Sequence, residues 1–185
     1  MRLTTTYLAG IATAALAGMP TDFLTLLQRD HGDLQKELTH LMDPISTVAQ
    51  MRSALDGVRL GLTAHAEAED IVLARFERIP GLEPLVGLAR AAHLAQEGAL
   101  SALVVAAPGT KIWRERAHHL RELVQSHAAQ EEQFLLPALR ERAPREMYDA
   151  LAGRFATERL RQLAMLQPSA PLSISDFAKL EIHAS

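Results

Sequence analysis

Three turns rich in proline and glycine divide this chain into segments of helical length. The turns are Asp43-Pro44, Pro80-Gly81 and Pro108-Gly109, and such pairs break both helices and strands. The apolar residues of the segments between them recur with a helical period. Alanine and leucine, both strong helix formers, supply 31 and 30 of the 185 residues. The chain is therefore predicted to be all-α.

Each segment also carries a signal for where its helix begins. We expect helices to start after caps at Thr21-Asp22, Ser46-Thr47 and Thr110, with a further helix over about 83–107. Pro137 should kink or end the last of these four helices. Long helices joined by short turns pack beside one another in antiparallel order, so we predict an antiparallel up-and-down four-helix bundle over residues 21–143.

The segments outside the bundle are less regular. Residues 144–167 have the pattern of an additional helix, and residues 168–185 that of a C-terminal tail. Residues 1–20 form an N-terminal extension whose Ala15-Leu16-Ala17 fits a signal-peptidase site. We favour a segment that docks on the domain over a signal peptide, and so expect a cytoplasmic protein. No other run of eighteen apolar residues occurs, so no membrane span is expected.

Charge and cysteine content exclude several kinds of partner and site. A formal net charge of −3 does not suit a nucleic-acid binder. The absence of cysteine excludes disulfides, thiolate metal sites and cysteine nucleophiles.

The histidines, in contrast, follow a pattern. Two predicted helices carry His-x-x-x-Glu, as His65 with Glu69 and His127 with Glu131. Residues four apart lie on one face of a helix, so each pair can reach a single point. An offset of 62 residues relates His31 to His93, His65 to His127, and Glu69 to Glu131. The chain thus reads as two helical hairpins of the same design, related by a pseudo-twofold axis.

The turns place these residues at one height in the bundle. His65 and His93 are equidistant from the Pro80-Gly81 turn, and His93 and His127 from the Pro108-Gly109 turn. Apolar residues continue both faces, giving the stripes His65, Glu69, Val72, Phe76 and His127, Glu131, Phe134, Ala138. Glutamates in such a seam are costly unless a dication neutralises them. The alternative is a metal-free bundle with buried His–Glu pairs.

Four imidazoles and two carboxylates suit iron, manganese or zinc. Glu69 and Glu131 are the natural bridges between two metal ions, and the histidines are terminal ligands. This set leaves coordination positions open for a small molecule. Glu97, four residues after His93, is a candidate additional ligand. The remaining histidines, His40, His118, His119 and His183, are not expected to coordinate, and Glu67, Asp70 and Glu132 should be solvated or contact the ligands.

The order His, His-x-x-x-Glu, His, His-x-x-x-Glu on four helices resembles the hemerythrin-like superfamily, the HHE cation-binding domains. Leu27 to His31 and His127 to Pro137 carry the local likeness, which covers roughly residues 21–140. The resemblance implies an oxo- or hydroxo-bridged centre of two iron ions. Oxygen-carrying members have a further histidine where this chain has Glu97, and a last carboxylate where it has Glu132. Members that repair iron–sulfur clusters carry a cysteine-containing region that is absent here.

We therefore expect a di-iron protein that binds or reacts with dioxygen, peroxide or nitric oxide. Whether it is an enzyme stays open at this stage. The alternatives are a protein that binds or stores iron, an enzyme that disproportionates peroxide, or a metal-free helical interaction module. No nucleic-acid or membrane partner is expected.

Overall fold

The computed structural model describes residues 22–167, and this part of the chain contains helices and no strand. The prediction of an all-α fold is therefore confirmed for residues 22–167. No helix in the described part is long and apolar enough to cross a membrane. The long helices are α2 (Phe23–Leu41), α3 (Val48–Leu73), α4 (Glu83–Val104) and α5 (Lys111–Gln130). The short turns η1 (Ala74–Phe76) and η2 (Glu131–Leu135) follow α3 and α5, and the chain continues as α6 (Leu136–Arg142), α7 (Arg145–Asp149) and α8 (Leu151–Leu166).

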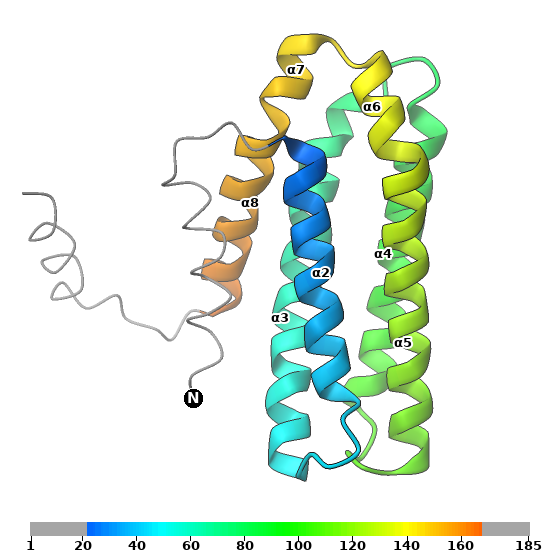
Figure 1. The fold of residues 1–185 in the computed structure, drawn as a ribbon, viewed down its shortest axis with the longest axis vertical. Coiled ribbons are helices and arrows are strands. Elements are labelled where there is room, and N and C mark those ends of the chain that lie inside the picture. The colour runs from blue at the N-terminus through cyan, green and yellow to red at the C-terminus, as the bar shows by residue number, and fades with distance from the viewer. Residues whose placement is uncertain (1–21, 168–185) are drawn as a thin grey trace, which may run out of the picture.

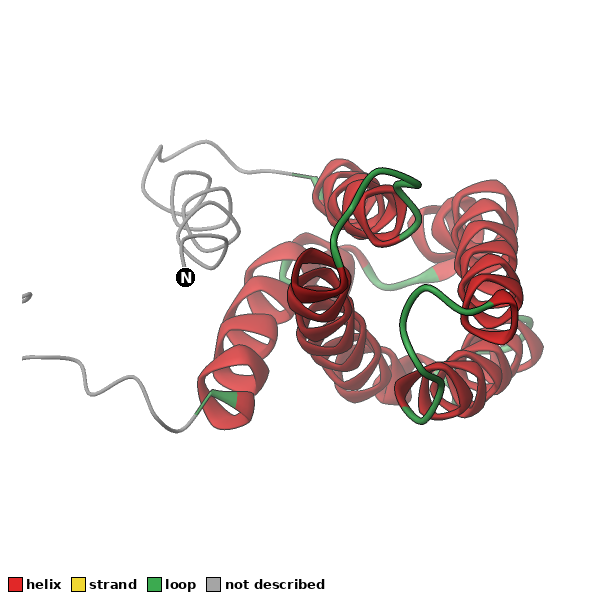
Figure 2. Ribbon diagram, turned by 90° about the horizontal axis from the view of Figure 1, so that it is seen from below, coloured by secondary structure: helices red, strands yellow, loops and turns green. Residues whose placement is uncertain are grey.

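Figure 1 shows the four long helices side by side along the longest axis of the molecule. Helix α2 contacts α3 and α5, while α4 contacts α5 and α3. Seen from the end in Figure 2, the four helices surround a common centre. Helix α8 lies outside this set and packs mainly against α3.

The local signals explain where these helices begin and end. Thr47 and Gln50 form a capping box at the start of α3, and the Thr110 hydroxyl accepts a hydrogen bond from the Trp113 backbone at the start of α5. Asp22 precedes α2, but its side chain makes no capping bond and instead accepts a hydrogen bond from the Tyr148 hydroxyl. Gly81 and Gly109 have φ of 80° and 81°, a conformation that glycine adopts without strain.

Two apolar cores lie at the two ends of the helices. One contains Phe23, Leu27, Val72 and Phe76, together with residues of α4, α6 and α8. The other contains Leu34, Leu38, Leu62, Leu103 and Trp113, among others. His31 lies between the two sets along α2, His65 along α3 and His93 along α4. A buried polar layer therefore separates the two cores.

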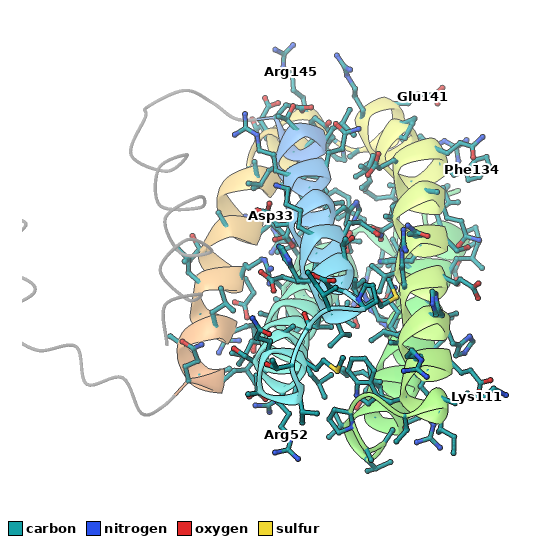
Figure 3. The ribbon with its side chains drawn as sticks, turned by 60° about the horizontal axis from the view of Figure 1, so that its bottom comes forward. Asp33, Arg52, Lys111, Phe134, Glu141 and Arg145 are labelled. Carbon is teal, nitrogen blue, oxygen red and sulfur yellow. The ribbon has the colours of Figure 1, made fainter. Side chains whose placement is uncertain are left out.

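The region around Pro137 departs from the expected register. The predicted inward stripe of α5 placed Phe134 in the seam, but Phe134 is 53% exposed and projects outward, whereas Leu135 is buried (Figure 3). The prediction for Phe134 was therefore wrong. The π-helical turn η2 adds a residue just before α6, and this shifts the inward face by one position. Pro137 has no backbone N–H and its ring crowds the carbonyl of Gln133, which accounts for the change in winding.

The additional helix predicted over residues 144–167 is also interrupted. It forms as α7 and α8, which meet at Ala150.

Two glycine substitutions test this account of the turns. Gly81→Ala should lower the free energy of unfolding by about 1–2 kcal/mol, because alanine is strained at positive φ. Its Cβ would also collide with the guanidinium of Arg142. Gly98→Ala, within α4 and with no atom within 4 Å of the new Cβ, should raise the free energy by about 0.5–1 kcal/mol. Urea unfolding measures both, and equal effects of the two substitutions would refute the account.

Candidate metal centre

The buried polar layer brings together all six residues related by the 62-residue offset. They are His31, His65, Glu69, His93, His127 and Glu131, and each is at most 5% exposed. Helices α2, α3, α4 and α5 each supply one histidine, while α3 and η2 supply the glutamates. The layer is thus built by residues from every long helix.

Two overlapping groups within this layer have the spacing of metal ligands. One consists of His31, His65, His127 and Glu131, and the other of His65, Glu69, His93 and His127. In each group, one ligand atom from every residue lies within 4.8 Å of the others. Either group could hold a metal ion. His65 and His127 belong to both groups, so two ions bound here would be close neighbours.

Each glutamate lies between two histidines. Oε2 of Glu69 is 3.3 Å from Nε2 of His65 and 3.5 Å from Nε2 of His93. Oε2 of Glu131 is 3.3 Å from Nε2 of His127 and 3.2 Å from Nε2 of His31. The two sets of contacts are related by the 62-residue offset. The pseudo-twofold symmetry predicted from the sequence therefore holds at the level of these contacts.

A second ring of carboxylates fixes three of the imidazoles from behind. Nδ1 of His65 is 2.7 Å from Asp30, Nδ1 of His93 is 2.9 Å from Asp70, and Nδ1 of His31 is 2.9 Å from Glu132. Each Nδ1–H donates to a carboxylate oxygen, so Nε2 faces the centre of the cluster. This arrangement is usual for histidines that bind metal ions, because it sets the tautomer and ring orientation.

The repeat extends to this second ring, with one break. Asp70 and Glu132 are 62 residues apart. Arg90, which lies near Asp70, and Gln28, which contacts Glu132, are also 62 residues apart. Gln28 donates a hydrogen bond to Glu132 at 3.1 Å, and Arg90 lies 4.0 Å from Asp70. Asp30 has no such counterpart, because Ala92 occupies the corresponding position. The carboxylate behind His65 is therefore not repeated behind His127.

Asp30 is held by a residue of α8. Nε of Arg159 donates to Oδ1 of Asp30 at 2.7 Å, and its Nη1 donates to the carbonyl of Gly61 at 2.9 Å. Arg159 is 0% exposed. Burial is the largest influence on the Asp30 carboxyl and raises its pKa, but the Arg159 charge and the contact with His65 outweigh it and leave the pKa lowered. Asp30 therefore stays ionised and accepts from His65.

Protonation within the cluster is uneven. Burial, together with the nearby charge of Glu69, raises the pKa of Glu131 well above its usual value. For Glu69 the neighbouring imidazoles of His65 and His93 outweigh burial and lower the pKa. Burial would lower the pKa of His93, but its hydrogen bond to Asp70 and the adjacent Glu69 carboxylate raise it to about 10. Burial lowers the pKa of His127 to about 3. His93 therefore donates from Nε2 to Nε2 of His127, 3.0 Å away.

The unpartnered atoms of the cluster match the needs of a cation. Both carboxylate oxygens of Glu69 and Glu131, and Nε2 of His31 and His65, make no hydrogen bond within the described part of the chain. Such buried atoms cost free energy unless something satisfies them. They are electron-pair donors that converge on one centre, so a metal ion bound to them would relieve this cost.

Glu97, the candidate additional ligand, is not brought into the cluster. Glu97 is exposed and belongs to neither metal-binding group. The residue that precedes it on α4, Gln96, is buried. His40, His118 and His119 are exposed, as expected of histidines that do not coordinate. His183 lies outside the described residues.

Sequence reasoning missed Asp30, Arg159 and Gln96. The 62-residue offset could have assigned Asp70 and Glu132 to the second ring, because both follow it. Asp30 and Arg159 follow no repeat and lie 129 residues apart. Only the packing of α8 brings them together.

Comparisons with protein-family models, curated proteins and solved structures found no match to this chain. The interpretation of the centre therefore depends on its own geometry.

The Arg159–Asp30 pair can be tested by removing its cation. Arg159→Met should lower the free energy of unfolding by about 3 kcal/mol, because it leaves a buried carboxylate unpaired. Arg161→Met, two residues along α8, removes an exposed arginine paired with Glu158, and its effect should be small. Chemical denaturation compares the two variants. Similar stabilities would show that the buried pair does not support the fold.

Proposed function

We propose that this chain is a hemerythrin-like non-haem di-iron protein that binds or reacts with dioxygen, peroxide or nitric oxide. The observation that carries the proposal is the buried cluster of four histidines and two glutamates with unpartnered donor atoms. The arrangement of the long helices agrees with an antiparallel up-and-down four-helix bundle to which α8 is added. Imidazole and carboxylate ligands suit iron, with manganese or zinc as alternatives.

The residues of the cluster have distinct roles in this proposal. The four histidines would hold the metal through Nε2, and Glu69 and Glu131, each between two histidines, would add their carboxylates. Asp30, Asp70 and Glu132 hold three of the rings in the tautomer that presents Nε2. Iron held by these residues would supply the electrons for any reduction of the small molecule.

A pocket beside the cluster suits a small apolar ligand. It has a volume of about 150 Å³ and is lined by His127 and Glu131 at the centre. The rest of its wall is mostly apolar: Leu85, Leu88, Ala89, Phe134 and Leu135, with Gln130. Dioxygen and nitric oxide are small and weakly polar, so this wall favours them over charged solutes. The two apolar cores keep water from the cluster along the axis of the helices.

Metal content and an electronic spectrum test the proposal directly. Protein produced with iron available should hold about two iron ions per chain, as expected of a di-iron centre. His65→Ala should lose most of this metal and the associated visible absorption, while His40→Ala, an exposed histidine of α2, should keep both. Parent protein without stoichiometric metal would refute the proposal.

Oxygen titration of the anaerobic ferrous protein separates the activities. A spectral change that reverses when oxygen is removed indicates a carrier, and irreversible oxidation indicates an enzyme or an oxygen sink. Release of oxygen from added peroxide indicates disproportionation. Stable ferrous protein that responds to none of these ligands would favour iron binding or storage.

The double variant Glu69→Gln/Glu131→Gln distinguishes a metal centre from a purely structural cluster. Without metal it should be more stable than the metal-free parent by about 1–2 kcal/mol, because the buried charge of Glu69 is removed while His93 keeps Asp70 as its partner. With metal added, the parent should gain stability and the variant should not. Thermal unfolding with and without chelator measures both. If the variant is less stable than the metal-free parent, the glutamates stabilise the helices by themselves, as in a metal-free interaction module.

A further inference from the structure

A second pocket lies between α3 and α4, on the side of the cluster where His93 is found. Its volume is about 150 Å³. Its lining is Leu62, Thr63, Ala66, Glu67, Asp70, His93, Leu94, Gln96, Glu97 and Leu100. Three of these residues are carboxylates, in contrast to the single glutamate that lines the apolar pocket beside His127.

Gln96 is the unusual residue of this pocket. It is 1% exposed, and neither its Oε1 nor its Nε2 has a hydrogen-bond partner within the described part of the chain. An amide buried without partners is costly, and each such group calls for a physical explanation. Gln96 lies one helical turn after His93, and these two are buried residues that line the pocket. A ligand or an ion in the pocket would supply the missing partner.

The charges at the pocket favour a cation. Glu67 and Glu97 are exposed, and the charge of Arg161 acts on Glu67 from α8. Asp70 is partly exposed. Its Oδ1 accepts a hydrogen bond from His93, and its Oδ2 lies 4.0 Å from Nε of Arg90. Arg90 itself contacts Glu77 at 2.6 Å. The carboxylates therefore outnumber the cations at this pocket, and such a charged cleft concentrates ions of opposite sign.

We propose that the α3–α4 pocket binds a divalent cation transiently and is the route by which the metal reaches the buried cluster. Glu67 and Glu97 attract the hydrated ion at the mouth. The amide oxygen of Gln96 and the carboxylate of Asp70 replace part of its water, since hard cations prefer oxygen ligands. His93 lines the pocket and belongs to the cluster, so it joins the two sites.

This proposal rests on the proposed function, since it needs a metal centre to be filled. The proposed route also gives a role to Glu97, which follows His93 by four residues but lies outside the cluster. Its carboxylate serves the route to the cluster and is not a permanent ligand.

Loading kinetics test the proposal. Metal-free protein is mixed with Co²⁺ in a stopped-flow instrument, and the visible absorption of the ligated ion is followed. The variant Glu67→Gln/Glu97→Gln should load at least about threefold more slowly at low ionic strength, with the same final stoichiometry, and the difference should shrink as salt is added. Gln96→Leu should also load more slowly. The control Glu122→Gln, which removes an exposed carboxylate from α5, should load at the parent rate.

The outcomes separate the two proposals. If the parent takes up Co²⁺ in a way that His65→Ala abolishes, the metal centre is supported whatever the rates. If the double variant then loads at the parent rate, or if Glu122→Gln slows loading equally, the route is refuted. If the parent takes up no Co²⁺, the metal centre itself fails and the route fails with it.

Discussion

The desolvation of six polar side chains is the constraint on which the rest of this structure depends. Glu69 and His65 are 0% exposed, and they lie between two apolar cores that offer no hydrogen bonds. A carboxylate in such surroundings costs several kcal/mol unless it is paired. Protons meet part of this need, since the pKa values of His93 and Glu131 are both raised. A metal ion bound to the unpartnered carboxylate oxygens would meet the rest.

The same constraint explains α8. A ring of carboxylates behind the histidines orients Nε2. Each of these carboxylates needs a partner of its own, such as a cation, a hydrogen-bond donor or solvent, to stabilise its negative charge. Asp70 and Glu132 lie near the surface, where solvent stabilises their charge. Arg90 lies near Asp70, and Gln28 donates a hydrogen bond to Glu132. Asp30 is buried, so it needs a buried cation, and Arg159 of α8 is that cation. Helix α8 is therefore part of the support of the centre, although it lies outside the four helices that carry the ligands.

Much of the fold and of the centre could be predicted from the sequence because both follow local or repeated signals. Pro80-Gly81, Pro108-Gly109 and the caps at Thr47 and Thr110 act within a few residues. The ligands follow the 62-residue offset, which is visible without a structure. Phe134 was misplaced because a π-helical turn changes the register, and no period of the sequence marks it. Asp30 and Arg159 could not be paired, since their contact depends on how α8 packs.

The break in pseudo-symmetry gives the two sides of the cluster different chemistry. At His93 the repeat supplies Asp70, and the adjacent pocket is lined by carboxylates and the Gln96 amide. Behind His127, Ala92 occupies the position that corresponds to Asp30, so no carboxylate is supplied there. The pocket next to His127 is mostly apolar. The first side would suit the hydrated cation of the proposed route, and the second the weakly polar diatomic molecule of the proposed function. Two hairpins of the same design can in this way give one buried layer two different surroundings, because the positions that break the repeat lie around the four histidines and two glutamates and leave these six residues unchanged.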